Sequence, residues 1–172
     1  KPTSIIRITS DCPLIEPFLL DKMVKKYQET KFDYFSNTIN PTFPDGFDVE
    51  IFSRKTLIYT YKNAKTDYEK EHVTPFMKND NNIKKYNYYS HKNYSDLRIT
   101  LDTEKDYRNI KNVLGYFTPR LDFKLKEIVQ LPKIIKDKLI NNKKIKQTKM
   151  NKGEKVWKKA KEIIPDGNMF YS

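Results

Sequence analysis

Short strand-like runs alternate with helical stretches along most of this 172-residue chain, and this alternation limits the folds that it can adopt. The strand-like runs are rich in β-branched and aromatic residues, and each helical stretch begins at a residue that favours a helix start. A chain with this order forms a sheet covered by helices, so we predict an α/β fold. The predicted strands are residues 4–9, 33–38, 47–52, 84–89 and 97–101, and the predicted helices begin at Pro17, Ser53, Thr66 and Thr103. Thr66 and Thr103 are each followed three residues later by an acid, Glu69 and Asp106, which is the spacing of a capping box. The helix from Thr66 is expected to reach about Met77.

The C-terminal part of the chain has a different pattern. Residues 122–139 read as helical with an interruption at Pro132, residues 141–153 are polar and lysine-rich, and residues 154–164 are amphipathic with helical spacing. A polar segment without apolar periodicity is typical of a linker. We therefore predict four parts: a main domain over residues 1–121, a helical extension over 122–140, a linker over 141–153 and a tail over 154–172.

Composition excludes several classes of protein. The mean hydropathy is −0.82, and no apolar run approaches the roughly 18 residues that a membrane span needs. Residues 1–11 contain no long apolar segment of a secretory signal, so we expect a cytoplasmic protein. A single cysteine, Cys12, and two histidines exclude a disulfide scaffold, a cysteine-built zinc site and a histidine-rich metal cluster.

The net charge of +12 raises nucleic acid as a partner, but the surplus is unevenly placed. Residues 122–172 hold 14 of the 34 basic residues and only six of the 22 acidic ones, so the main domain is only mildly basic. No base-stacking motif or recognition-helix pattern accompanies the lysines. This pattern argues against nucleic acid as the partner.

Two acidic residues each follow a predicted strand and precede a predicted helix. Asp11 ends IIRITSD, and Asp102 ends LRITLD. In α/β sheets ligands bind beyond the carboxyl ends of the strands, where two carboxylates can hold Mg²⁺ and a triphosphate. If both strands are parallel in one sheet, the two acids meet at one edge. The alternatives are that Asp11 caps a turn and that Asp102 is an acid favoured at a helix N-terminus.

A second group of polar residues lies between these two. Asp48 and Glu50 share a face of the strand in FPDGFDVEIF, where they can bind sugar hydroxyls or face water. Glu71 and His72 are expected at the rim of a helix. A single histidine is more often structural or exposed than catalytic.

Five blocks of sequence, in order, resemble the cytidylyltransferases that make CMP-activated acidic sugars. The blocks are SDCPLIEPFLLDKMV, DYFSNT, PTFPDGFDVEIFS, EKEHVTPF and LRITLDTEKDY, which lie within residues 4–114. The nearest branch is the spore-coat polysaccharide type, which is related to acylneuraminate and 3-deoxy-manno-octulosonate cytidylyltransferases.

The resemblance implies a nucleotide-diphospho-sugar transferase-like (Rossmann-like) three-layer sandwich. It implies an Mg²⁺-dependent enzyme that transfers CMP from CTP to an acidic sugar for surface polysaccharide biosynthesis, with release of pyrophosphate, and a homodimer as the assembly to test. By matched motif, Asp11 and Asp102 are the catalytic and metal-binding acids. The substrate-binding candidates are Asn37, Asp48, Glu50, Glu71 and His72.

The chain departs from the family pattern in two places. The family opens with a strand and a glycine- and basic-rich loop that holds the triphosphate, and Lys1 already lies at the start of a later strand. We therefore expect a fragment that lacks this loop and is inactive alone, because the nucleotide loses its main anchor. Lys70 also stands where the family usually has arginine, and the two are not equivalent at a phosphate.

The tail carries a second resemblance. GEKVWKKAKEIIPDGN is similar to the opening of glutamate-1-semialdehyde-type aminotransferases, with Asp166 where a second glycine is usual. The resemblance implies that the parent protein is a fusion in which pyridoxal phosphate binds outside this chain. The alternative is an amphipathic tail helix that packs on the main domain.

Two other functions remain open from the sequence. One is a glycosyltransferase on the same fold, which uses a metal-binding acid to transfer a sugar from a sugar nucleotide. The other is a non-catalytic docking or regulatory module with a degenerate nucleotide site and a basic tail.

Overall fold

The computed structural model describes residues 3–140. The predicted linker over 141–153 and the predicted tail helix over 154–164 lie outside the described residues. The described chain forms two compact units, each built from separate stretches. Among the described residues, the first comprises 3–8, 17–42 and 48–92, and the second comprises 9–16, 43–47 and 93–140.

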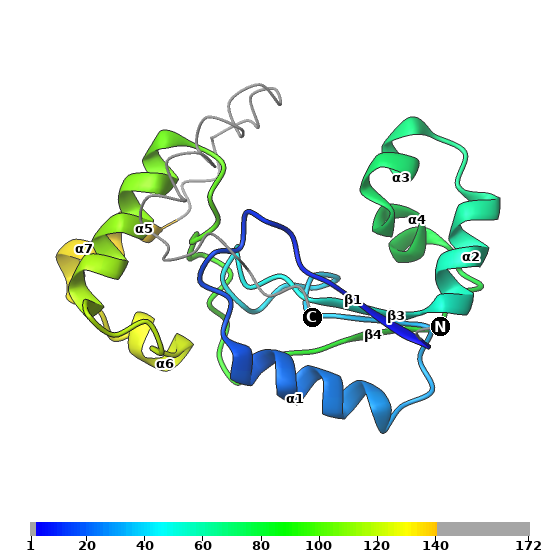
Figure 1. Cartoon of the computed structure of the whole chain (residues 1–172), viewed down its shortest axis with the longest axis horizontal. Helices are drawn as coiled ribbons and strands as arrows, with labels where there is room; N and C mark the ends of the chain where they lie inside the picture. The colour runs from blue at the N-terminus through cyan, green and yellow to red at the C-terminus, as the bar shows by residue number, and fades with distance from the viewer. Residues whose placement is uncertain (1–2, 141–172) are drawn as a thin grey trace. The chain divides into compact units, whose positions relative to one another are not determined.

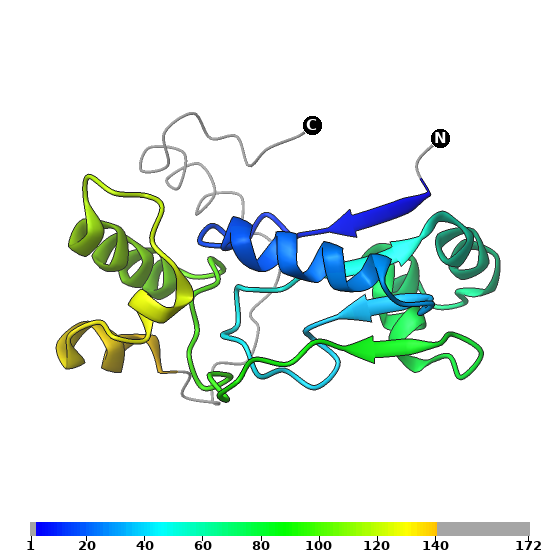
Figure 2. The same cartoon turned by 90° about the horizontal axis from the view of Figure 1, so that it is seen from below.

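The first unit contains a four-stranded mixed sheet with the order β1-β3-β2-β4. The strand β3 runs antiparallel to both neighbours, and β2 and β4 are parallel. Figure 2 shows the strands with α1 passing in front of them. The bounds are β1 Ser4–Arg7, β2 Tyr34–Ser36, β3 Glu50–Ser53 and β4 Lys85–Asn87.

Helices cover both faces of this sheet, which makes the first unit a three-layer arrangement. The helix α1 (Pro17–Gln28) lies along one face, and α2 (Arg54–Asn63) and α4 (Thr74–Asn79) lie on the other (Figure 1). On the α1 face, the Tyr27 ring meets Phe35 of β2 at 6.0 Å between centroids. On the other face, Tyr34 and Phe52 pack with Met77. The predicted α/β class, with helices on both faces of a sheet, is confirmed.

Local start signals predicted the helices well. Ser53 accepts a hydrogen bond from the backbone N–H of Thr56 and caps α2. Thr66 forms the predicted capping box with Glu69 and opens α3 (Asp67–His72). The helix expected to continue to residue 77 instead breaks at Val73, whose φ is 63°, and restarts as α4. The break follows from Pro75, whose ring excludes a continuous helical backbone in the preceding turn.

The strand prediction over residues 47–52 was wrong about exposure. Alternating apolar and acidic residues indicated one solvent-facing side, but β3 lies between β1 and β2, and Glu50, Ile51 and Phe52 are all buried. A strand between two neighbours and two helical layers has no open face. Glu50 is therefore an interior carboxylate rather than a surface acid.

Within residues 3–140, the second unit contains the helices α5, α6 and α7. The helix α5 (Glu104–Phe117) begins with the predicted capping box of Thr103 and Asp106, and it buries Ile110, Val113 and Leu114. The helices α6 (Leu125–Ile128) and α7 (Lys133–Leu139) lie on either side of the interruption at Pro132. The side-chain amide of Asn109 donates to the Lys138 carbonyl at 2.8 Å and ties α5 to α7.

Residues 97–101 do not form the predicted strand. They are extended, with Leu97, Ile99 and Leu101 buried, but they pair through isolated bridges with different segments. Within residues 3–140, this segment forms isolated β-bridges that join Arg98 to Asp45 and Leu97 to Ile140. The strand-like pattern therefore identified an extended segment correctly but not its partners.

Candidate functional site

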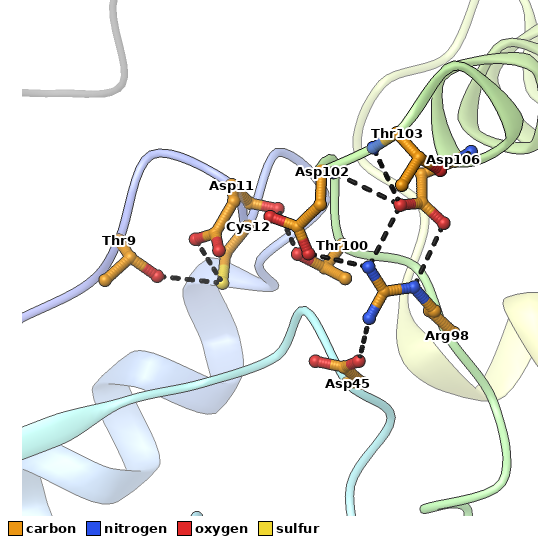
Figure 3. Close-up of polar contacts among 9 residues, drawn as sticks. All are labelled: Thr9, Asp11, Cys12, Asp45, Arg98, Thr100, Asp102, Thr103 and Asp106. Carbon is orange, nitrogen blue, oxygen red and sulfur yellow. Dashed lines mark hydrogen bonds and ion pairs between the residues drawn. The ribbon is translucent and has the colours of Figure 1, made fainter. Parts of the chain in front are cut away.

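Asp11 and Asp102 come together in the second unit, as the sequence predicted. The backbone N–H of Leu101 donates to the Asp11 carbonyl at 2.8 Å, and the Thr100 hydroxyl donates to the same oxygen at 3.0 Å. The predicted reason was wrong, because these residues do not end two parallel strands of one sheet. Instead, the turn at residues 9–16 is fastened directly to the extended segment that ends at Asp102 (Figure 3).

The turn around Asp11 is held by its neighbours. The Cys12 N–H donates to the Thr9 carbonyl at 3.1 Å, and Cys12 is buried. The thiol donates to Oδ1 of Asp11 at 3.7 Å and lies 3.5 Å from the Thr9 hydroxyl. These contacts fix a half-buried carboxylate at the tip of a short turn.

The Asp102 carboxylate lies in an environment that disfavours its charge. Partial burial raises its pKa, the hydrogen bond from Arg98 lowers it, and the nearby Asp11 charge raises it again, with a net increase. The two carboxylates therefore repel each other in the apo protein, and a bound cation would relieve that repulsion. Oxygen donors are the ligands that Mg²⁺ prefers, so this pair suits a hard divalent cation.

Arg98 organises the acids around Asp102. Its Nη2 donates to Oδ2 of Asp102 at 2.6 Å, and its Nη1 donates to Oδ2 of Asp45 at 2.5 Å. Nε and Nη2 also form a fork with the two oxygens of buried Asp106, each at 3.0 Å. Burial lowers the pKa of Arg98, but the hydrogen bonds and negative charges of the surrounding aspartates have a larger effect, so the pKa is raised overall. The side chain stays ionised and bridges three carboxylates.

Sequence reasoning missed Arg98 and Asp45, and it took Asp106 only as a helix cap. A signal for Arg98 was present, because residues two and four apart in an extended segment share a face. The polar Arg98, Thr100 and Asp102 alternate with the apolar Leu97, Ile99 and Leu101. For Asp45 no local signal exists, because the loop at 43–47 reaches this segment only through the tertiary fold.

Gly46 allows that loop to approach the extended segment. Its φ is +103°, and a Cβ there would lie 2.6 Å from the carbonyl carbon of Ile99 and from the nitrogen of Thr100. The close approach lets Ile99 donate to the Asp45 carbonyl at 2.8 Å. The glycine thus brings Asp45 to Arg98 through backbone contact.

The substrate-binding candidates belong to the first unit. The side-chain oxygen of buried Asn37 accepts a hydrogen bond from the Val49 N–H at 2.9 Å, which extends the pairing between β2 and β3. Asp48, which precedes Val49 in the chain, is half-buried. Glu71 and His72 are exposed at the end of α3, where the His72 ring lies 4.6 Å from Tyr68. Their roles toward a sugar stay predictions.

Glu50 is enclosed by polar partners. The Tyr34 hydroxyl donates to Oε1 at 2.5 Å, Arg7 donates to Oε2 at 2.5 Å, and the Lys78 ammonium lies 3.2 Å from Oε1. Burial alone raises the pKa of Glu50, but Tyr34, Lys78, Thr74 and Arg7 together lower it below its ordinary value. This carboxylate ties the strands β1, β2 and β3 to α4, and its part in sugar binding stays a prediction.

The Glu50 cluster predicts a pH-dependent stability. Because the folded-state pKa lies below the unfolded one, ionised Glu50 stabilises the fold above its ordinary pKa of about 4.5, and this contribution is lost as pH falls through the folded-state value. We expect urea midpoints of the native chain to fall more steeply below pH 4.5 than those of Glu50→Gln. Exposed Glu71→Gln should follow the native curve, and equal slopes for the native chain and Glu50→Gln would contradict the assignment.

The described residues contain neither a complete protein-built metal site nor a helix suited to a membrane. Within residues 3–140, no group of three or more histidine, cysteine, aspartate or glutamate side chains is arranged to hold a metal ion. Asp11 and Asp102 can thus supply only part of a coordination shell. None of the described helices combines the length and apolar character that crossing a bilayer demands.

Comparison with known proteins gives consistent results. A family model described as cytidylyltransferase matches residues 1–162. An uncharacterized protein of Methanocaldococcus jannaschii is 32% identical over 161 residues, which cover 92% of this chain and 62% of that protein. The spore coat polysaccharide biosynthesis protein SpsF of Bacillus subtilis is 30% identical over 135 residues, which cover 76% of this chain and 55% of that protein.

A solved structure agrees with these relatives. A cytidylyltransferase from Leptospira borgpetersenii matches with a TM-score of 0.74 and 30% identity over 81% of this chain and 60% of that one. This match confirms the predicted nucleotide-diphospho-sugar transferase-like fold. The chain spans about three-fifths of the length of the relatives that it matches. The family match includes residues 154–162, which also resemble the opening of an aminotransferase. The fusion of a cytidylyltransferase with an aminotransferase stays a prediction.

Proposed function

The chain belongs to the cytidylyltransferase family, and from this premise we propose that the protein transfers CMP from CTP to an acidic sugar and releases pyrophosphate. The observation that carries the proposal is the meeting of Asp11 and Asp102 on backbone segments that are hydrogen-bonded to each other. The similarity to a spore coat polysaccharide biosynthesis protein supports a sugar as the acceptor.

The reaction needs charge neutralisation more than covalent help from the protein. A sugar oxygen attacks the α-phosphorus of CTP, the bond to the β-phosphate oxygen breaks, and the electron pair leaves with pyrophosphate while the acceptor proton passes to solvent. Such transfers depend on in-line positioning and on stabilisation of the phosphate charge. The protein therefore has to hold the reacting groups and balance their negative charge.

We assign Asp11 and Asp102 as the residues that hold Mg²⁺. Mg²⁺, when bound, neutralises phosphate charge and polarises the phosphoryl oxygens. Asp11 offers a half-buried carboxylate on a fixed turn, and Asp102 offers one whose pKa is raised partly by Asp11. Since Mg²⁺ usually shares protein carboxylates with substrate phosphates, two acids are enough on the protein side.

Pyrophosphate release tests the proposal. The protein that carries this chain, in its natural length, should release pyrophosphate from CTP and Mg²⁺ when given nonulosonic or octulosonic acids. Neutral sugars and other nucleoside triphosphates should give much less, because an acidic acceptor and cytosine are both required. Transfer of a sugar from a sugar nucleotide, without pyrophosphate release, would instead indicate the glycosyltransferase alternative.

A further inference from the structure

Arg98 has an unusual set of partners for a half-buried arginine. One guanidinium contacts the carboxylates of Asp45, Asp102 and Asp106 over distances of 2.5 to 3.0 Å. Asp106 is itself fixed, because one of its oxygens accepts from the backbone N–H of Thr103 at 3.0 Å at the start of α5. Arg98 therefore links Asp102 to a helix terminus and to the loop that carries Asp45.

The backbone around Arg98 is held without its side chain. The Arg98 N–H donates to the Leu139 carbonyl at 2.7 Å, and the N–H groups of Ile99 and Leu101 donate to the carbonyls of Asp45 and Asp11, each at 2.8 Å. These bonds do not involve the guanidinium. A change of the side chain should thus leave the path of this segment largely in place.

The contact with Asp102 uses one side of its carboxylate. The hydrogen bond and ion pair from Arg98 engage Oδ2 at 2.6 Å, so the guanidinium does not occupy Oδ1. In Figure 3 the Asp11 side chain lies on one side of Asp102 and Arg98 on the other. A planar guanidinium that is itself anchored restricts the rotation of the carboxylate that it binds.

We propose that Arg98 is a positioning residue that holds Asp102 through Oδ2 and keeps Oδ1 oriented for a divalent cation. The inference rests on the proposed function, which assigns Asp102 to Mg²⁺. The positioning role predicts that loss of Arg98 weakens cation binding, whereas charge repulsion alone predicts that it strengthens cation binding. A positive charge beside a cation site repels the cation, so its removal alone should strengthen cation binding. Loss of the orientation of Asp102 should instead weaken cation binding. Removal of a residue that positions a metal ligand commonly lowers metal affinity by about 10- to 100-fold.

Binding of Mn²⁺ to the full 172-residue chain, measured by water-proton relaxation without nucleotide, separates these cases. We expect Arg98→Gln to lower Mn²⁺ affinity about tenfold or more. Arg98→Lys keeps the charge but not the fork, so its affinity should stay within a few-fold of that of Arg98→Gln. Arg120→Gln is the matched control, because Arg120 bridges Asp122 and Glu127 at 3.0 Å each without touching Asp102, and it should bind as the native chain does.

Asp102→Asn distinguishes the two levels of the proposal. If Asp102→Asn loses Mn²⁺ while Arg98→Gln binds as tightly as the native chain or more tightly, the positioning role is wrong and the metal assignment stands. If Asp102→Asn binds Mn²⁺ as the native chain does, the metal assignment fails and the role of Arg98 fails with it. Circular dichroism melting checks that each variant is folded. Should Arg98→Gln not fold, native affinity in Arg98→Lys would overturn the inference.

Discussion

Replacement of Asp102 by asparagine in the protein of natural length should lower kcat for pyrophosphate release by roughly three orders of magnitude. The substitution keeps the shape of the side chain but removes the negative charge proposed to hold Mg²⁺ against the triphosphate. Asp11→Asn should have an effect of similar size. Since the two acids act on one ion, Asp11→Asn combined with Asp102→Asn should lose much less than the product of the single losses.

The assay is pyrophosphate release at saturating CTP and acidic sugar, over a series of Mg²⁺ concentrations. Asp122→Asn is the matched control, since Asp122 is an exposed aspartate that pairs with Arg120 at 3.0 Å. It should retain native activity. A loss of less than tenfold in Asp102→Asn at all Mg²⁺ concentrations would remove Asp102 from the proposed metal site.

Substitution of Gly46 by alanine should destabilise the protein by about 3 kcal/mol or more, because a strained backbone and a steric clash add together. The residue has a φ of +103°, and the added Cβ would lie 2.6 Å from backbone atoms of Ile99 and Thr100. These atoms belong to the segment that leads to Asp102. The variant should therefore also bind Mn²⁺ more weakly in whatever fraction remains folded.

Gly115→Ala provides the opposite case. Gly115 lies within α5, and a Cβ there would meet no atom within 4 Å. Alanine is favoured over glycine in a helix interior by roughly 1 kcal/mol, so this variant should be slightly more stable. Urea unfolding monitored by circular dichroism compares the two. If both substitutions shift the midpoint in the same direction, the close approach at Gly46 is not the dominant effect.

Local signals predicted those parts of the fold that depend on neighbouring residues. The capping residues Ser53, Thr66 and Thr103 each start the expected helix, because a cap acts over three residues. The strand-like pattern of residues 97–101 identified an extended segment, in which Leu97, Ile99, Thr100 and Leu101 are all buried. The partners of that segment could not be predicted, since Asp45, Asp11 and Leu139 reach it from distant parts of the sequence.

The difference between local signals and contacts with distant residues also explains which features of the candidate site could be predicted. The position of Asp11 and Asp102 after β-rich runs predicted that they would meet, although through two parallel strands rather than a turn fastened to an extended segment. The burial of Glu50 could not be predicted from its own strand, because its partners Arg7, Tyr34 and Lys78 come from three other elements. Charge balance in an interior depends on tertiary neighbours that a local pattern does not contain.

The hydrogen bonds that fasten the Asp11 turn have a consequence for synthesis on the ribosome. The Thr100 hydroxyl and the Asp11 carbonyl are 89 residues apart in sequence, and Arg98 is held in turn by Leu139. Domains fold during synthesis from the N-terminus onward, and contacts between distant residues form slowly. The Asp11 turn therefore leaves the ribosome long before its partners, and the pair of acids is completed only after residue 139 has emerged.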